Sequence, residues 1–233
     1  MIAIPRAERL IVALDVPSAK EARALAEKLG DAARFYKIGL ELFTAEGYFE
    51  LLGWLTGRGN KVFVDLKLYD IPETVRRAVA NLSGRGATFL TVHAHRSVME
   101  AAAREKGEMQ ILAVTVLTSF EQRDFQEFET MKTVEEIVLA RARAAADAGC
   151  DGVIASGLEA KALKAEFKQR LRVVTPGIRP LKANDDQKRA VDPAQAFANG
   201  ADYIVVGRPI RDAADPREAA EGIQQTIASI FTA

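Results

Sequence analysis

The sequence predicts an α/β protein, a (β/α)₈ TIM barrel that forms a single domain over residues 1–233. Eight short apolar runs, rich in Val and Ile, alternate with longer amphipathic stretches. Their nearly continuous hydrophobicity is typical of parallel strands that are buried on both faces. No linker rich in Pro, Gly or Ser separates the repeating units. A chain of this length is long enough for one such barrel.

The order of the elements supports this assignment. The first apolar run is followed by a helix at 19–29, where Ala22, Leu25, Ala26 and Leu29 recur at helical spacing. Long periodic stretches at 134–148 and 213–231 predict further helices. An open doubly wound sheet has the same alternation, but the count of eight favours a closed barrel. The predicted strands cover residues 10–14, 35–38, 62–66, 89–92, 111–116, 152–155, 172–175 and 203–206.

Composition argues against several classes of function. Lys plus Arg and Asp plus Glu each number 32, so the formal net charge is zero. Such a chain has no general attraction to nucleic acid or to an anionic membrane. No run approaches the ~18 apolar residues of a membrane span, and the first residues do not resemble a signal peptide. The single cysteine, Cys150, is interpreted as a small buried residue, and we expect a cytoplasmic protein.

Two connections between a strand and the following helix are longer than the rest. One covers residues 118–132, after the fifth strand, and the other covers 177–192, after the seventh. Long loops at the carboxyl ends of barrel strands usually carry binding groups or lids. We therefore expect both loops to border a site.

Charged residues gather where the first three strands end. Alternation puts Asp65 and Lys67 on one face of the third strand, and Asp70 follows in the turn. Asp15 ends the first strand, and Lys37 lies near the end of the second. Because neighbouring strand ends converge in a barrel, these residues predict an alternating set of carboxylates and ammonium groups at its mouth.

This charged set has a structural and a functional interpretation. Charges in an apolar frame are costly to bury unless they pair, so a salt-bridge network could serve the fold alone. Five such residues on three successive strands favour a functional site. Flanking carboxylates would hold Lys67 protonated, because opposite charges favour the charged form. A fixed ammonium can donate a proton to a carbanion or bind an anion.

A phosphate site is predicted where the eighth strand ends, at Gly207 and Arg208. A backbone amide and a guanidinium fork suit phosphate, and barrels often bind phosphate with the loops after strands seven and eight. The alternative is a surface turn with a solvated arginine. Ser156, in Ala-Ser-Gly, is predicted either to face the mouth or to cap a helix.

The spacing of His93 and His95 raises the question of a metal pair. Without an accompanying cysteine, a structural role is the favoured interpretation. The sequence contains no His-Glu-X-X-His, Walker or dinucleotide-binding motif. We therefore predict neither a metal nor a cofactor.

The segment Asp-Leu-Lys-Leu-Tyr-Asp-Ile-Pro-Glu-Thr, at 65–74, closely resembles the signature of the orotidine 5′-phosphate decarboxylase family. Four further segments resemble that family in the same chain order, so the resemblance extends from residue 10 to about 210. They are Ile-Val-Ala-Leu-Asp-Val, Phe-Tyr-Lys-Ile-Gly, Val-Thr-Pro-Gly-Ile-Arg-Pro and Val-Val-Gly-Arg-Pro-Ile.

The resemblance implies cofactor-free decarboxylation of orotidine 5′-monophosphate to uridine 5′-monophosphate and carbon dioxide, a step of pyrimidine biosynthesis. It implies that Asp65, Lys67, Asp70 and Lys37 form the catalytic set and that Lys67 donates the proton. For substrate binding it implies a further set: Asp15 and Lys37 at the ribose, Thr118 at the pyrimidine, Arg179 and Arg208 at the phosphate, and Gln187 at both phosphate and base.

The resemblance also implies a homodimer in which Asp70 and Thr74 reach the partner's site. Related barrels with the same Asp-X-Lys-X-X-Asp motif, 3-keto-gulonate 6-phosphate decarboxylase and hexulose-phosphate synthase, use magnesium and have a Glu in place of Lys37. An ammonium there would repel the metal, which argues against these activities. The remaining alternative is a barrel that binds phosphorylated ligands without turnover.

Overall fold

The computed structural model describes residues 4–120, 122–124, 132–179 and 191–231. Its strands form one closed parallel barrel in chain order, from β1 to β8, and β1 also pairs with β8. The predicted (β/α)₈ barrel is therefore confirmed, and the open sheet is excluded. The strands are β1 (Leu10–Ala13), β2 (Phe35–Gly39), β3 (Lys61–Leu68), β4 (Phe89–His93), β5 (Gln110–Val114), β6 (Gly152–Ile154), β7 (Arg172–Thr175) and β8 (Tyr203–Val206).

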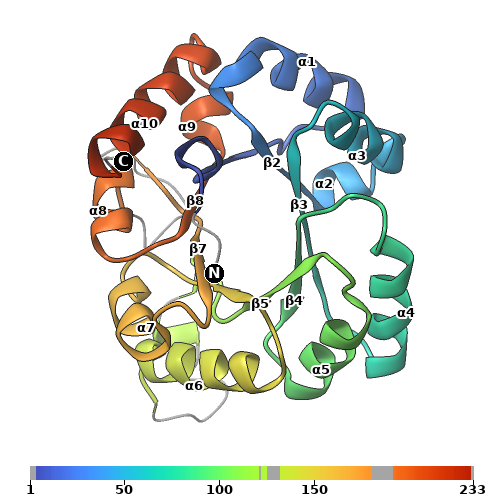
Figure 1. Ribbon diagram of the computed structural model, residues 1–233, viewed down its shortest axis with the longest axis vertical. Coiled ribbons are helices and arrows are strands. Elements are labelled where there is room, and N and C mark those ends of the chain that lie inside the picture. The colour runs from blue at the N-terminus through green and yellow to red at the C-terminus, as the bar shows by residue number, and fades with distance from the viewer. Residues whose placement is uncertain (1–3, 121, 125–131, 180–190, 232–233) are drawn as a thin grey trace.

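Helices form a ring around the strands, and α10 lies beside α1 where the ring closes (Figure 1). The helix predicted at 213–231 begins later, because Asp215 caps it and accepts hydrogen bonds from the N–H groups of Arg217 and Glu218. The helices are α1 (Ala19–Leu29), α2 (Leu40–Phe43), α3 (Tyr48–Gly57), α4 (Pro72–Leu82), α5 (Arg96–Glu105), α6 (Val134–Asp147), α7 (Ala160–Phe167), α8 (Pro193–Ala198), α9 (Arg208–Arg211) and α10 (Pro216–Ile230), with 3-10 turns η1 (Arg6–Glu8) and η2 (Gly30–Ala32). Within the described residues, no helix is long and apolar enough to cross a membrane.

The core has two layers, because side chains of each strand alternate between the barrel interior and the helices. Inside the barrel, aromatic rings from the beginnings of the strands pack together. The ring of Phe89 lies 5.0 Å from that of Phe35 and 5.2 Å from that of Tyr203, between ring centroids. These rings fill the amino end of the barrel. Space for a ligand therefore remains at the carboxyl ends of the strands.

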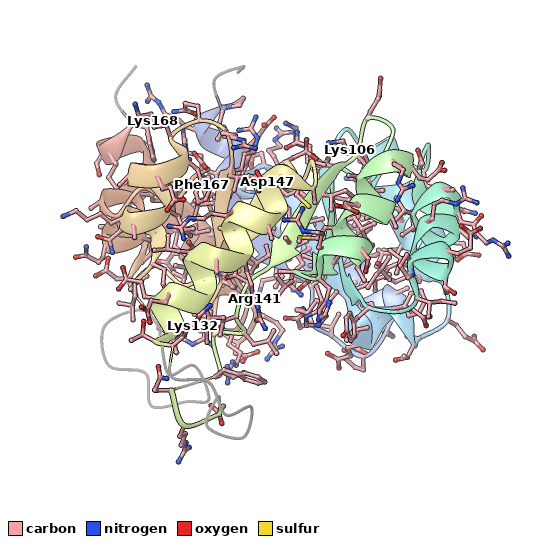
Figure 2. The ribbon with its side chains drawn as sticks, turned by 90° about the horizontal axis from the view of Figure 1, so that it is seen from below. Lys106, Lys132, Arg141, Asp147, Phe167 and Lys168 are labelled. Carbon is pink, nitrogen blue, oxygen red and sulfur yellow. The ribbon has the colours of Figure 1, made fainter. Side chains whose placement is uncertain are left out.

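Two partly buried ion pairs with similar contacts lie at the amino end. Lys106 binds the carboxylate of Asp151 at 2.7 Å, and that carboxylate also accepts a backbone hydrogen bond from β5. Lys164 binds Asp202 at 2.5 Å, and Asp202 accepts a backbone hydrogen bond from β7. Figure 2 shows Lys106 at this end of the molecule, with Lys132 toward the opposite end. These charges serve the fold, because they lie away from the carboxyl ends.

Helix α6 connects the two ends of the barrel. It begins at a capping box in which Thr133 and Glu136 exchange hydrogen bonds between side chain and backbone. Figure 2 shows the helix running from the side of Lys132 to Asp147, with Arg141 between them. Arg141 donates a hydrogen bond to the carbonyl of Thr115 and so ties α6 to the end of β5.

Candidate active site

A cavity of about 380 Å³ opens at the carboxyl ends of the strands. Its walls combine apolar side chains with charged and polar groups. Most of the residues that the sequence analysis singled out line it: Asp15, Lys37, Asp65, Lys67, Thr118, Arg179, Gly207 and Arg208. A concave pocket with a few convergent polar groups is the usual form of a small-molecule site.

The charged residues of the first three strands form a continuous chain of contacts in this cavity, here called the charged array. Lys37 Nζ lies 2.7 Å from Asp15 Oδ1 and 3.6 Å from Asp65 Oδ2. Lys67 Nζ lies 2.9 Å from each carboxylate oxygen of Asp65. Carboxylate and ammonium thus alternate from Asp15 through Lys37 and Asp65 to Lys67. The predicted alternation of charges is present in the structure.

Asp65 is the centre of the array and is buried. Burial alone would raise the pKa of its carboxyl group, but the nearby charges of Lys37 and Lys67 outweigh burial and lower that pKa. Thr91 contributes a further hydrogen bond, which its hydroxyl donates to Asp65 Oδ1 at 2.8 Å. Asp65 is therefore held as a carboxylate in the interior of the cavity. Sequence reasoning missed Thr91, which carries no charge.

Lys37 is buried on β2 between two carboxylates. Burial opposes its charge, yet Asp65 and Asp15 together raise the pKa of the Lys37 ammonium. Gly39 leaves room for this group, because a Cβ atom at Gly39 would lie 3.0 Å from Lys37 Nζ. Gly39, two positions after Lys37, therefore permits the close approach of the lysine to both carboxylates.

Strand β3 is irregular where Lys67 leaves it. Its register against β4 shifts between Val64 and Leu68, as in a β-bulge. Lys67 has a φ of 48°, which is the left-handed region that side chains other than glycine seldom adopt. The Lys67 N–H donates to the hydroxyl of Thr91 at 3.0 Å, which anchors the irregular backbone. Asp65 and Lys67 both line the cavity.

Arginines line the part of the cavity at the ends of β7 and β8, where β8 pairs with β1. Gly207 follows β8 as the N-cap of α9, and Arg208 is the first residue of that helix. Arg179 is buried after β7 and donates a hydrogen bond from Nη1 to the carbonyl of Ile178 at 2.9 Å. Arg211, at the end of α9, also lines the cavity, although no pattern in the sequence indicated it. These guanidinium groups make this part of the cavity suitable for an anion.

Two predicted residues lie outside the cavity. Asp70 is exposed, and its Oδ1 accepts a hydrogen bond from the N–H of Ile71 at 2.7 Å. Thr74 is exposed on the first turn of α4. The structure therefore does not bring Asp70 together with Lys67 within one chain. Gln187 lies outside the described residues.

The two histidines contact an aromatic ring. The ring of Tyr69 lies 5.4 Å from that of His93 and 5.3 Å from that of His95. Burial lowers the pKa of His93, and the nearby charge of Lys67 adds to the effect. Among the residues that the structure describes, no group of three or more His, Cys, Asp or Glu side chains could hold a metal ion.

The structure corrects the prediction for Ser156 and supports the interpretation of Cys150. The Ser156 hydroxyl is buried and accepts a hydrogen bond from the N–H of Leu158 at 3.2 Å. It neither lines the cavity nor caps α7, whose N-cap is Glu159. Cys150 is buried, and burial raises the pKa of its thiol to about 12, which makes a reactive thiolate unfavourable.

Known proteins resemble this chain over nearly its whole length. Residues 8–223 match the family described as "Orotidine 5′-phosphate decarboxylase / HUMPS family". An orotidine 5′-phosphate decarboxylase of Methylococcus capsulatus is 58% identical over 232 residues, which cover 99% of this chain and 96% of that protein. One of Rhodopseudomonas palustris is 51% identical, with 95% of each chain covered. The crystal structure of orotidine 5′-phosphate decarboxylase from Lactobacillus acidophilus has a TM-score of 0.82 and 36% identity, and covers 94% of this chain and 99% of that one.

Proposed function

The chain belongs to the orotidine 5′-phosphate decarboxylase / HUMPS family, and we propose that it is a carboxy-lyase that converts orotidine 5′-monophosphate to uridine 5′-monophosphate and carbon dioxide. This reaction is a step of pyrimidine biosynthesis. We propose that the chain acts as one catalytic barrel domain without a cofactor. The observation that carries the proposal is the charged array. In it, the buried Asp65 carboxylate lies between two ammonium groups, those of Lys37 and Lys67, in a substrate-sized cavity.

The charged array supports a direct decarboxylation. When the bond between the pyrimidine ring and its carboxylate breaks, carbon dioxide leaves and the electron pair stays on the ring carbon. The ammonium of Lys67 stabilises the developing carbanion and donates the proton that completes the product. The resulting neutral amine then recovers a proton from solvent. Asp65, which is held ionised, fixes Lys67 in position.

The rest of the cavity provides contacts for a nucleotide. Asp15 and Lys37 bind the ribose hydroxyls, and Thr118 binds the pyrimidine. Arg208, Arg179 and the backbone amide of Gly207 bind the phosphate, together with Gln187, which also reaches the base. The arginines line the same cavity as the charged array, at the ends of β7 and β8. Binding energy from the distant phosphate can thus order the reacting end of the substrate.

Lys37 separates this proposal from the magnesium-dependent activities of related barrels. A divalent cation between Asp15 and Asp65 would have to displace the Lys37 ammonium, which lies 2.7 Å from Asp15 Oδ1 and 3.6 Å from Asp65 Oδ2. The same two carboxylates raise the pKa of Lys37, so the ammonium does not readily give up its charge. The array is therefore suited to work without a metal.

We further propose that two chains form a homodimer in which Asp70 and Thr74 enter the partner's site. Asp70 and Thr74 are exposed, outside their own cavity. Tyr69 and Ile71 flank Asp70 and are 61% and 67% exposed. Large apolar side chains that are exposed together often mark an interface. A second copy of the chain would cover these side chains and receive Asp70.

Cys150 is the only cysteine, which suits a reducing compartment, and we propose that the protein works in the cytoplasm. The test of the proposed activity is an ultraviolet assay of orotidine 5′-monophosphate loss by the purified protein. We expect turnover that is unchanged after exhaustive chelation. Turnover that falls on chelation and returns with magnesium would contradict the metal-free proposal. Tight binding of the nucleotide without turnover would indicate a barrel that only binds.

A further inference from the structure

Arg211 connects the two strands at which the barrel closes. Its Nη1 donates a hydrogen bond to the backbone carbonyl of Asp15 at 2.6 Å, a contact between residues 196 positions apart in sequence. The other edge of the guanidinium binds the carboxylate of Asp212, through Nε to Oδ1 at 2.6 Å and through Nη2 to Oδ2 at 3.0 Å. The backbone N–H of Arg211 donates to Gly207 at 2.9 Å. The side chain is therefore fixed from both sides.

Asp15, in contrast, lies beyond the regular part of its strand. Strand β1 ends at Ala13, and the N–H of Leu14 still donates to the carbonyl of Lys37 at 2.9 Å. The side chain of Asp15 is 42% exposed, whereas that of Lys37 is 11% exposed. Burial therefore does little to fix the Asp15 carboxylate, so its position depends more on the hydrogen bond between its main chain and Arg211.

We propose that Arg211 is a positioning residue of the charged array. It holds the main chain of Asp15 so that the carboxylate keeps its contact with Lys37. Lys37 in turn contacts Asp65, and Asp65 contacts Lys67. A displacement of Asp15 thus alters the first link of the array. This inference rests on the proposed function, because it gives Arg211 a role in the same reaction.

An alternative is that Arg211 binds the phosphate itself, because it lines the cavity as Arg208 does. The contacts favour positioning. The carboxylate of Asp212 forms a paired contact with the guanidinium and offsets its charge, and a third N–H group is directed at Asp15. The hydrogen bond from Arg211 to Asp212 also raises the pKa of Arg211. These donors are already satisfied within the protein.

The first experiment separates positioning from phosphate binding. Arg211→Ala should lower kcat/KM by about 10- to 100-fold, the scale on which a misplacement of about 1 Å affects a reaction. Inhibition by inorganic phosphate should stay within about twofold of wild type, because a positioning residue makes no phosphate contact. Arg208→Ala should weaken phosphate inhibition much more. Equally weakened phosphate inhibition in both variants would overturn the proposal.

The second experiment asks whether Arg211 acts through Asp15. If it does, adding Arg211→Ala to Asp15→Ala should cause no further loss of kcat/KM. Losses that multiply would show two independent roles and overturn the proposal. Arg211→Lys should lose less than Arg211→Ala, because an ammonium can still donate to the Asp15 carbonyl.

The control is Arg217→Ala, which removes an exposed arginine paired with Glu221 and Asp31 on the outside of the barrel and should leave kcat/KM unchanged. If Arg211→Ala does not fold, Asp212→Ala tests the same idea, since it frees the guanidinium and should cause a partial loss. Normal kcat/KM in a folded Asp212→Ala variant would then overturn the inference. An inactive wild type would instead refute the proposed function.

Discussion

Lys67 Nζ lies 2.9 Å from both carboxylate oxygens of Asp65, its neighbour two positions earlier on the same strand. The pair lines the cavity, and Lys37 reaches the same carboxylate from the neighbouring strand β2. Removing one partner of such a pair leaves the other charge poorly compensated in a partly buried place. Asp65 and Lys67 should therefore be treated as one unit in any experiment on the site.

Lys67→Ala should abolish most of the proposed decarboxylation, because it removes the group that protonates the ring carbanion. We expect kcat to fall by at least about 10²-fold, the lower end of the range for a positioned general acid. Lys61→Ala is the matched control, since Lys61 lies at the other end of β3 and binds Glu8 at 2.5 Å. Steady-state kinetics would measure both. A folded Lys67→Ala variant with near-normal kcat would refute the assigned role.

Arg208→Ala should weaken binding of the phosphorylated substrate by roughly 1.5–3 kcal/mol, the range for hydrogen bonds to charged groups. Turnover of the nucleoside without phosphate should change little. Arg143→Ala is the control, because Arg143 is an arginine of α6 that pairs with Glu166 at 2.6 Å away from the cavity. Measurement of kcat/KM for the nucleotide and for the nucleoside tests this prediction. Equal losses on both would mean that Arg208 serves the fold or the chemistry.

Mixed dimers should recover activity if Asp70 works in the partner's site. When subunits of Lys67→Ala and Asp70→Ala exchange, one site of each mixed dimer has both changes and the other has neither. Random exchange makes about half of the dimers mixed, so about a quarter of all sites should recover in a closed two-fold dimer. Mass-tagged chains would verify the exchange. Verified exchange without regained activity would show that Asp70 acts within its own chain.

The fold should lose stability in mild acid through His93. Burial, with Lys67, Arg141 and His95, lowers the pKa of His93 below its usual 6.5. The unfolded chain then binds the proton more tightly than the folded one. The contribution of neutral His93 to the free energy of unfolding is therefore complete above about pH 6.5, and it is lost as the pH falls through the lowered pKa of His93 in the folded protein.

His93→Gln should remove this part of the pH dependence, and His95→Gln, at an exposed position, is the control. Urea denaturation from pH 8 to pH 5 would measure the free energy of unfolding. Wild type should lose more stability than His93→Gln over that interval. Parallel curves for the two proteins would contradict the prediction.

The barrel could be predicted because its signal is repeated and local. Eight apolar runs alternate with amphipathic stretches, and each run became a strand whose limits differ from the prediction by at most two residues. Short helices such as α9 carry too few residues to show periodicity, so the stretch around Arg208 did not predict one.

The charged array was predictable because charged side chains are rare at the ends of apolar strands. The contacts that set its geometry were not. Thr91 looks like any β-branched strand residue, and the bond between Arg211 and Asp15 joins opposite ends of the chain. The bulge at Lys67 depends on pairing with β4, which sequence spacing does not report. Local pattern found the charges, whereas tertiary contacts determine how they meet.

The left-handed backbone of Lys67 has a consequence for protein engineering. An L-residue in that conformation costs roughly 1–2 kcal/mol, which a glycine would largely avoid. Lys67→Gly would relieve that strain, but it would also take one of its two ammonium contacts from the buried Asp65 carboxylate. The strained backbone and the ion pair therefore act against each other at this residue, so a thermostable lineage has to gain its stability at other positions.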